Sequence, residues 1–146
     1  MNDEDFNKFT PLDFLELAVE LDKFSDELNI DNSVVERNIF GRLYYSSFLY
    51  VREWLSKHWK YKSKGPRDHT TMPNFIKSKG PFGEVENNLI SDLLLELKKL
   101  RHQSDYYLEI PEEGTDEYKK WIFEDVDYAF NSARYIIDSF KKLNIK

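Results

Sequence analysis

The chain contains no cysteine, and glycine and proline are scarce, with five of each among 146 residues. The absence of cysteine excludes a disulfide framework, a thiolate nucleophile and a Cys-ligated zinc site. No apolar run is long enough to span a bilayer, and residues 1–5 are acidic, unlike the basic start of a signal peptide. We therefore expect a soluble cytoplasmic protein with no membrane contact.

Several kinds of catalytic and metal site are also missing. The three histidines, His58, His69 and His102, lack the helical spacing of a metalloprotease, and no cluster of carboxylates completes a metal set. There is neither a phosphate-binding glycine loop nor a Gly-x-Ser-x-Gly motif. We expect no metal and no cofactor.

Aromatic residues make up 16% of the chain, which argues against disorder although 33% of the residues are charged. The length suits one domain, residues 1–146, with a substantial core. Apolar residues recur every three or four positions and predict long helices near 11–29, 34–61, 84–108 and 116–143. Thr10-Pro11, Ser33 with Glu36, and Thr115 have the residue types of helix starts.

The connection at 60–81 contains three prolines, and its short apolar piece at 74–76 predicts a turn or two of helix. The predicted fold is all-α, an antiparallel four-helix up-and-down bundle with a short extra helix in this connection. The second helix carries more aromatic residues than one apolar stripe needs. We therefore expect part of it, or the face that carries Arg101, to pack against a second protomer as a two-fold dimer.

Charge is unevenly distributed along the chain, whose net charge is −6. Residues 1–31 are strongly acidic, whereas residues 57–79 hold seven lysine or arginine residues and one aspartate. In the basic segment Lys60, Lys62 and Lys64 alternate with rings, as in proteins that bind single-stranded nucleic acid. In the other interpretation, Trp59 and Tyr61 anchor the helix end and the lysines interact with its negative terminus.

The segment 100–107 combines an arginine, a histidine, an aspartate and two tyrosines after a leucine-rich stripe. Arg101 and Asp105 are four residues apart and share a helix face, and His102 shares the adjoining face with Tyr106. Such a set can bind or cleave a phosphodiester. It can equally be an ion pair beside two tyrosines packed into a bundle.

Three segments together resemble the HEPN superfamily of small helical domains, named from higher eukaryotes and prokaryotes. They are the small-and-aromatic stretch 37–48, the His69-containing stretch 68–75, and the segment 100–106. The last is similar to the "Leu-Arg, three residues, Asp-Tyr" signature of one prokaryotic branch. The resemblance covers roughly residues 10–143.

The resemblance implies a four-helix bundle that is usually a homodimer. Many members are metal-independent ribonucleases of toxin–antitoxin, CRISPR or anti-phage systems, and others accompany minimal nucleotidyltransferases or bind nucleotides. The ribonucleases carry an arginine and, after four to six residues, a histidine. Counted from Arg101, those positions hold Tyr106, Tyr107 and Leu108, so only Arg101 matches that motif. Asp105 and Tyr106 match the branch signature.

We therefore predict a dimeric HEPN-type protein that binds RNA or a nucleotide in a defence or toxin–antitoxin setting. Arg101 would contact phosphate, Asp105 would orient Arg101, and Tyr106 would stack or donate a hydrogen bond. One alternative is a metal-independent endoribonuclease that uses Arg101 with His102, or with His69 from the connection. Another is a catalytically silent interaction module that docks a nucleotidyltransferase.

Overall fold

The computed structural model describes residues 10–107 and 109–143, and this part of the chain is all-helical, as predicted. No strand occurs in it, and none of its helices is both long and apolar enough to cross a membrane. The predicted helix end at 108 and the acidic residues 1–5 lie outside the described residues. The elements are α2 (Pro11–Lys23), α3 (Asn32–His58), the 3-10 turn η1 (Gly65–Arg67), α4 (Asp68–Lys79), α5 (Glu84–Tyr106), α6 (Asp116–Lys119) and α7 (Val126–Lys141).

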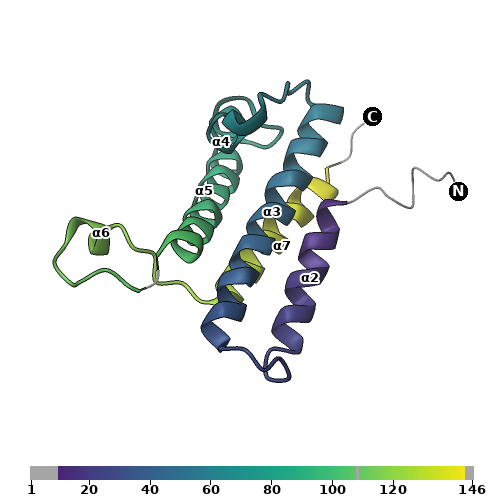
Figure 1. The fold of residues 1–146 in the computed structure, drawn as a ribbon. Coiled ribbons are helices and arrows are strands. Elements are labelled where there is room, and N and C mark those ends of the chain that lie inside the picture. The colour runs from purple at the N-terminus through teal and green to yellow at the C-terminus, as the bar shows by residue number, and fades with distance from the viewer. Residues whose placement is uncertain (1–9, 108, 144–146) are drawn as a thin grey trace, which may run out of the picture.

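Helix α3 is central to the packing. It contacts α2, α5 and α7, and α5 also contacts α4 and α7 (Figure 1). The buried face of α3 includes Ile39, Leu43, Phe48, Val51 and Leu55. Because three other helices pack on α3, its aromatic residues are largely used within one chain. The aromatic content of α3 therefore gives no support of its own to a dimer.

The predicted start of the first helix is confirmed, since α2 begins at Pro11 and the Thr10 backbone N–H donates to Asp13 at 2.9 Å. The predicted cap of α3 is wrong by two residues. Asp31, not Ser33, is the N-cap, and its carboxylate accepts from the Ser33 backbone N–H at 2.8 Å. An aspartate oxygen is a good acceptor for the unpaired N–H groups of a first turn, so α3 begins at Asn32.

All four long helices end earlier than predicted. α2 ends at Lys23, and residues 24–27 form turns instead of continuing to 29. α5 ends at Tyr106 rather than 108, and α7 ends at Lys141 rather than 143. α3 ends at His58 rather than 61, because Lys60 adopts a left-handed backbone with φ 56°.

The prediction of one helix over 116–143 is wrong. The chain forms the four-residue helix α6, then a non-helical stretch, and then α7 from Val126. Thr115 does cap α6, but Asp125 caps α7 by accepting from the Tyr128 backbone N–H at 2.8 Å. Residues 109–125, which we call the excursion, extend away from the long helices beside the C-terminal end of α5 (Figure 1).

The extra helix in the 60–81 connection is longer than predicted, since α4 has 12 residues and includes Pro73. Proline lacks the N–H that would bond to the carbonyl four residues earlier, which here belongs to His69. That carbonyl instead accepts from the Lys98 ammonium of α5 at 3.3 Å. The Ser91 hydroxyl of α5 donates to the Pro73 carbonyl at 2.9 Å. α4 is thus held by α5 at the point where its own hydrogen bonding is interrupted.

Candidate functional site

Arg101 lies against α3 near the C-terminal end of α5. Its guanidinium carbon is 4.9 Å from the ring centroid of Tyr45 and 5.9 Å from that of Tyr44. Its Nε donates to Asp105 at 3.1 Å, so the predicted i,i+4 ion pair is present. Among the described residues no other side chain or backbone group bonds to its two terminal nitrogens. These nitrogens form the fork that binds phosphate or carboxylate.

His69 is brought beside the same tyrosines by the start of α4. The Tyr44 hydroxyl is 2.6 Å from His69 Nδ1. The imidazole stacks on Phe48 with ring centroids 4.2 Å apart and an angle of 9° between planes. Tyr44 and Phe48 are buried residues of α3, so the position of the His69 ring is fixed by the core.

Two further cations surround His69. Lys98 is three residues before Arg101 on α5 and reaches the His69 carbonyl and the Thr70 hydroxyl. Arg52 of α3 lies over Phe48, with its guanidinium carbon 5.3 Å from the ring centroid. We call Tyr45, Arg52, His69, Lys98 and Arg101 the cationic cluster. α3, α4 and α5 each contribute to it.

The start of α4 is anchored by Asp68, which is completely buried. Its carboxylate accepts from the Tyr61 hydroxyl at 2.6 Å, from the Lys64 backbone N–H at 2.7 Å and from the Ser63 hydroxyl. Arg52 lies 3.5 Å from it. Burial raises the pKa of Asp68, but the hydrogen bonds and Arg52 outweigh burial and hold it below the ordinary range. Asp68 is therefore ionised at neutral pH.

Charge in the cluster favours a neutral imidazole. Burial lowers the pKa of His69, and the charges of Arg101, Lys98 and Arg52 lower it further, against an opposing effect of Asp68. Burial raises the pKa of Tyr44 well above its ordinary value. His69 and Tyr44 are both neutral at pH 7, and the charges of Arg101, Lys98 and Arg52 make the potential around His69 positive.

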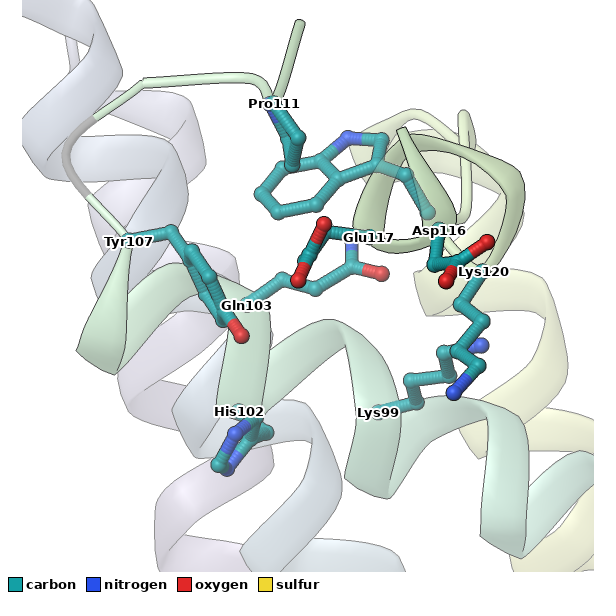
Figure 2. Close-up of a pocket in the computed structure, with 9 residues that line it drawn as sticks. Lys99, His102, Gln103, Tyr107, Pro111, Asp116, Glu117 and Lys120 are labelled. Carbon is teal, nitrogen blue, oxygen red and sulfur yellow. The ribbon is translucent and has the colours of Figure 1, made fainter. Parts of the chain in front are cut away.

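His102 faces different neighbours from Arg101. It is exposed, its ring lies 4.7 Å from that of Tyr106, and it lines a cavity of about 240 Å³. Figure 2 shows this cavity between the last turns of α5 and the excursion, with Tyr107 and His102 on one side and Lys99 and Lys120 on the other. Successive helix residues point about 100° apart. Within one chain, therefore, the structure does not bring His102 to Arg101.

Tyr106 and the lysines of the basic segment are available to solvent. Tyr106 is 69% exposed, and Lys60, Lys62 and Lys64 are exposed on the stretch before η1. Trp59 and Tyr61 have partners within the chain. The Trp59 indole N–H donates to the Lys79 carbonyl at 2.7 Å, and Tyr61 is buried against Asp68. These contacts favour the interpretation of the two rings as anchors.

Sequence reasoning missed Tyr44, Tyr45, Arg52, Asp68 and Lys98 as site residues. The two tyrosines lie in a segment that carried the family resemblance, and Lys98 has the three-residue spacing that shares a helix face with Arg101. Asp68 begins another of those segments, and no sequence signal pointed to Arg52. Across residues 10–107 and 109–143 no group of His, Asp and Glu side chains could hold a metal ion.

The chain is 34% identical over 150 residues to the uncharacterized protein MJ0628 of Methanocaldococcus jannaschii. The match takes in 90% of this chain and 85% of the relative, so the chain belongs to the same family as that archaeal protein. No family model and no solved structure matches the chain.

Proposed function

We propose that this chain is a HEPN-type domain that binds RNA or a nucleotide through a phosphate at the cationic cluster. In this proposal α2, α3, α5 and α7 are the four helices of an up-and-down bundle. The observation that carries the proposal is the position of Arg101, supported by Tyr45 on one side and by Asp105 at Nε. Its terminal fork remains available for an anion, and Lys98 and Arg52 add positive charge from two helices.

Binding is favoured over cleavage by the separation of Arg101 from His102. Metal-independent cleavage needs groups that move protons as well as a group that stabilises charge. Arginine stays protonated and does not serve as the proton carrier. An endoribonuclease using His102 would need that residue from a second protomer, and one using His69 would need a ring nitrogen that Tyr44 does not occupy.

One neighbouring feature extends the proposed surface. The basic segment adjoins the cluster, because the Lys64 backbone N–H donates to Asp68, the residue before His69. Tyr106, which was predicted to stack on a base, lies beside His102 on a different face of α5 from Arg101. A prokaryotic defence or toxin–antitoxin system is the setting we propose from the family resemblance. The interaction module that accompanies a nucleotidyltransferase is the alternative if no nucleic acid binds.

Replacing Arg101 with alanine is expected to weaken binding of a short fluorescein-labelled single-stranded RNA by about tenfold or more, the value of a charge-assisted hydrogen bond. The salt dependence of binding should also become shallower, by about 0.7 for each phosphate that the variant no longer binds. Fluorescence polarisation at several salt concentrations measures both quantities. Arg101→Lys keeps the charge but not the fork, so its affinity for the RNA should lie between those of Arg101→Ala and the parent chain.

Lys119→Ala is the matched control, because Lys119 is exposed on α6 and outside the cluster. Circular dichroism of each variant checks that the helices are retained. Equal affinity of Arg101→Ala and the parent chain, or no RNA binding at low salt, would remove the cluster as a phosphate site.

A homodimer is also part of the proposal. The surface that we propose for it is the exposed face of α5, which is neither the predicted α3 surface nor the face that carries Arg101. Val85, Asp92, Leu95, Lys99 and Tyr106 recur at helical spacing, and all are exposed. In an antiparallel pair of α5 helices centred beside Leu95, this spacing sets Asp92 opposite Lys99 of the partner subunit. The same arrangement sets Val85 opposite Tyr106 of the partner subunit. A two-fold interface must be self-complementary in this way.

Reversing one charge in this stripe tests the dimer. Lys99→Asp should weaken self-association by about tenfold or more, because Asp92 then meets a like charge twice across the two-fold axis. The double variant Asp92→Lys with Lys99→Asp should restore it. Light scattering measures the fraction of chains at twice 17.5 kDa. A monomeric parent chain throughout the micromolar range would contradict the proposal.

A further inference from the structure

The second polar group of the cationic cluster is the His69 imidazole, whose two nitrogens have different surroundings. Nδ1 faces the Tyr44 hydroxyl at 2.6 Å. Within the described residues no hydrogen bond is made by Nε2. The residue is only half-buried, although its ring stacks on Phe48. One nitrogen is therefore committed to the core and the other is left without a protein partner.

The direction of the Tyr44–His69 hydrogen bond follows from the charges around it. A cationic imidazole carries protons on both nitrogens, so it would require the tyrosine oxygen to accept. The groups that face the ring are Tyr44, Tyr45 and Arg52 from α3, Asp68 from α4, and Lys98 and Arg101 from α5. Three of them are cations. The one carboxylate, Asp68, is bonded to Tyr61, Ser63 and the Lys64 backbone.

A neutral imidazole beside a neutral phenol permits one arrangement in which both Tyr44 and a phosphate are satisfied. The Tyr44 hydroxyl donates to Nδ1, and the imidazole proton then resides on Nε2. We propose that His69 binds the phosphate as a neutral hydrogen-bond donor through Nε2–H, with its tautomer fixed by Tyr44. This inference rests on the proposed function, and it assigns His69 to recognition beside Arg101. Tyr44 is then a positioning residue that acts through His69.

This assignment has a chemical consequence for the endoribonuclease alternative. A general base needs a free lone pair, and in this tautomer the lone pair of His69 is on Nδ1, which already accepts from Tyr44. His69 therefore adds a donor for phosphate and does not remove a proton from an attacking hydroxyl. Arg101 supplies positive charge and His69 supplies a directional hydrogen bond, and both suit the binding of an intact phosphodiester.

The tautomer can be measured directly by long-range ¹H–¹⁵N correlation NMR of the uniformly ¹⁵N-labelled full chain. The three histidines are assigned by single substitutions. At neutral pH His69 is expected to show a protonated Nε2 and an unprotonated Nδ1, and Tyr44→Phe should allow the second tautomer to appear. An imidazolium, or a proton on Nδ1, in the parent chain would overturn the inference.

Binding of the same labelled RNA tests the role of the donor. The amide nitrogen of glutamine can replace the Nε2–H of this tautomer, so His69→Gln should retain affinity within about threefold, whereas His69→Leu should lose about tenfold, the worth of one charge-assisted hydrogen bond. Tyr44→Phe should weaken binding less than His69→Leu, since only the fixation of the tautomer is lost. A glutamine variant as weak as the leucine variant, or a leucine variant as strong as the parent chain, would overturn the inference.

These outcomes separate the inference from the function on which it rests. If Arg101→Ala weakens RNA binding and the His69 variants do not, the cluster binds phosphate and the assigned role of His69 is wrong. If the parent chain binds no RNA at low salt, the proposed function is wrong, and the inference about phosphate recognition fails with it. The NMR result then still decides the tautomer.

Discussion

Replacing Asp68 with alanine is expected to lower the free energy of unfolding by about 3–5 kcal/mol, the usual cost of breaking a buried charged network. The carboxylate is completely buried and accepts from Tyr61, Ser63 and the Lys64 backbone. Its removal leaves the Tyr61 hydroxyl and the Lys64 N–H without this acceptor, and leaves Arg52 without its counter-charge. For a chain of this size the melting temperature should fall by on the order of 10 °C.

Two variants make the Asp68 test specific. Asp68→Asn keeps one acceptor oxygen but turns an N–H₂ group towards other donors, so it should destabilise nearly as strongly. Asp26→Ala removes an exposed carboxylate from the turns after α2 and should change stability by no more than about 0.5 kcal/mol. Urea unfolding monitored by circular dichroism measures all three. If Asp68→Ala lowers the free energy of unfolding by less than Asp26→Ala does, the network does not hold α4.

The pH dependence of stability should show contributions from His69 and Asp68 in separate ranges. The pKa of His69 in the folded chain lies below its ordinary value of 6.5, so the unfolded chain takes up the proton first. The contribution of His69 to the free energy of unfolding is present above pH 6.5 and is lost as pH falls through the folded pKa. The pKa of Asp68 in the folded chain is likewise lowered from 3.8. Its contribution to the free energy of unfolding is therefore present above pH 3.8 and is lost as pH falls through the folded pKa. His69→Gln should remove the first contribution, and Asp68→Ala the second.

The parts of the fold that the sequence predicted well depend on local periodicity. α2 starts at its Pro11, α5 begins at Glu84, and the Arg101–Asp105 pair follows from a spacing of four residues within one helix. These features involve residues that are close in sequence. Helical geometry alone therefore determined them.

The features that the sequence did not predict depend on contacts between distant segments. The sequence predicted only a turn or two of helix at 74–76, after Pro73. The helix instead includes Pro73, and Lys98, 29 residues from His69, bonds to the carbonyl left free. Tyr44 and His69 are 25 residues apart, and their hydrogen bond has no local signal. The sequence left open whether Tyr61 stacks on a base or anchors the helix end, and the contact that favours the anchor is with Asp68, which gives the Tyr61 hydroxyl a buried acceptor.

Residues 116–125 of the excursion were predicted as helix because their apolar residues continue a helical spacing into α7. In the structure the Gln103 side chain of α5 provides hydrogen-bond partners for the backbone of the excursion, in place of the hydrogen bonds of a helix. The Gln103 amide donates to the Ile122 carbonyl at 3.2 Å and accepts from the Ile122 N–H at 2.8 Å. Both groups of one residue are thus satisfied by one buried side chain. Tyr107 adds an edge-to-face contact with Trp121, with ring centroids 5.5 Å apart.

Gln103→Leu is therefore expected to release the excursion from α5 while the long helices remain folded. Leucine fills similar space but leaves the Ile122 N–H and C=O unpaired, at a local cost of about 2–4 kcal/mol. Hydrogen exchange at the Ile122 amide should accelerate by about thirtyfold or more, since 1.4 kcal/mol corresponds to a factor of ten. Lys99→Ala, in the wall of the same cavity, should leave this exchange unchanged.

RNA binding should also be unchanged in Gln103→Leu, because Arg101 and His69 are positioned by α3 and α4. Unchanged exchange at Ile122 would show that other contacts hold the excursion. A large loss of RNA binding would instead place part of the binding surface on the excursion.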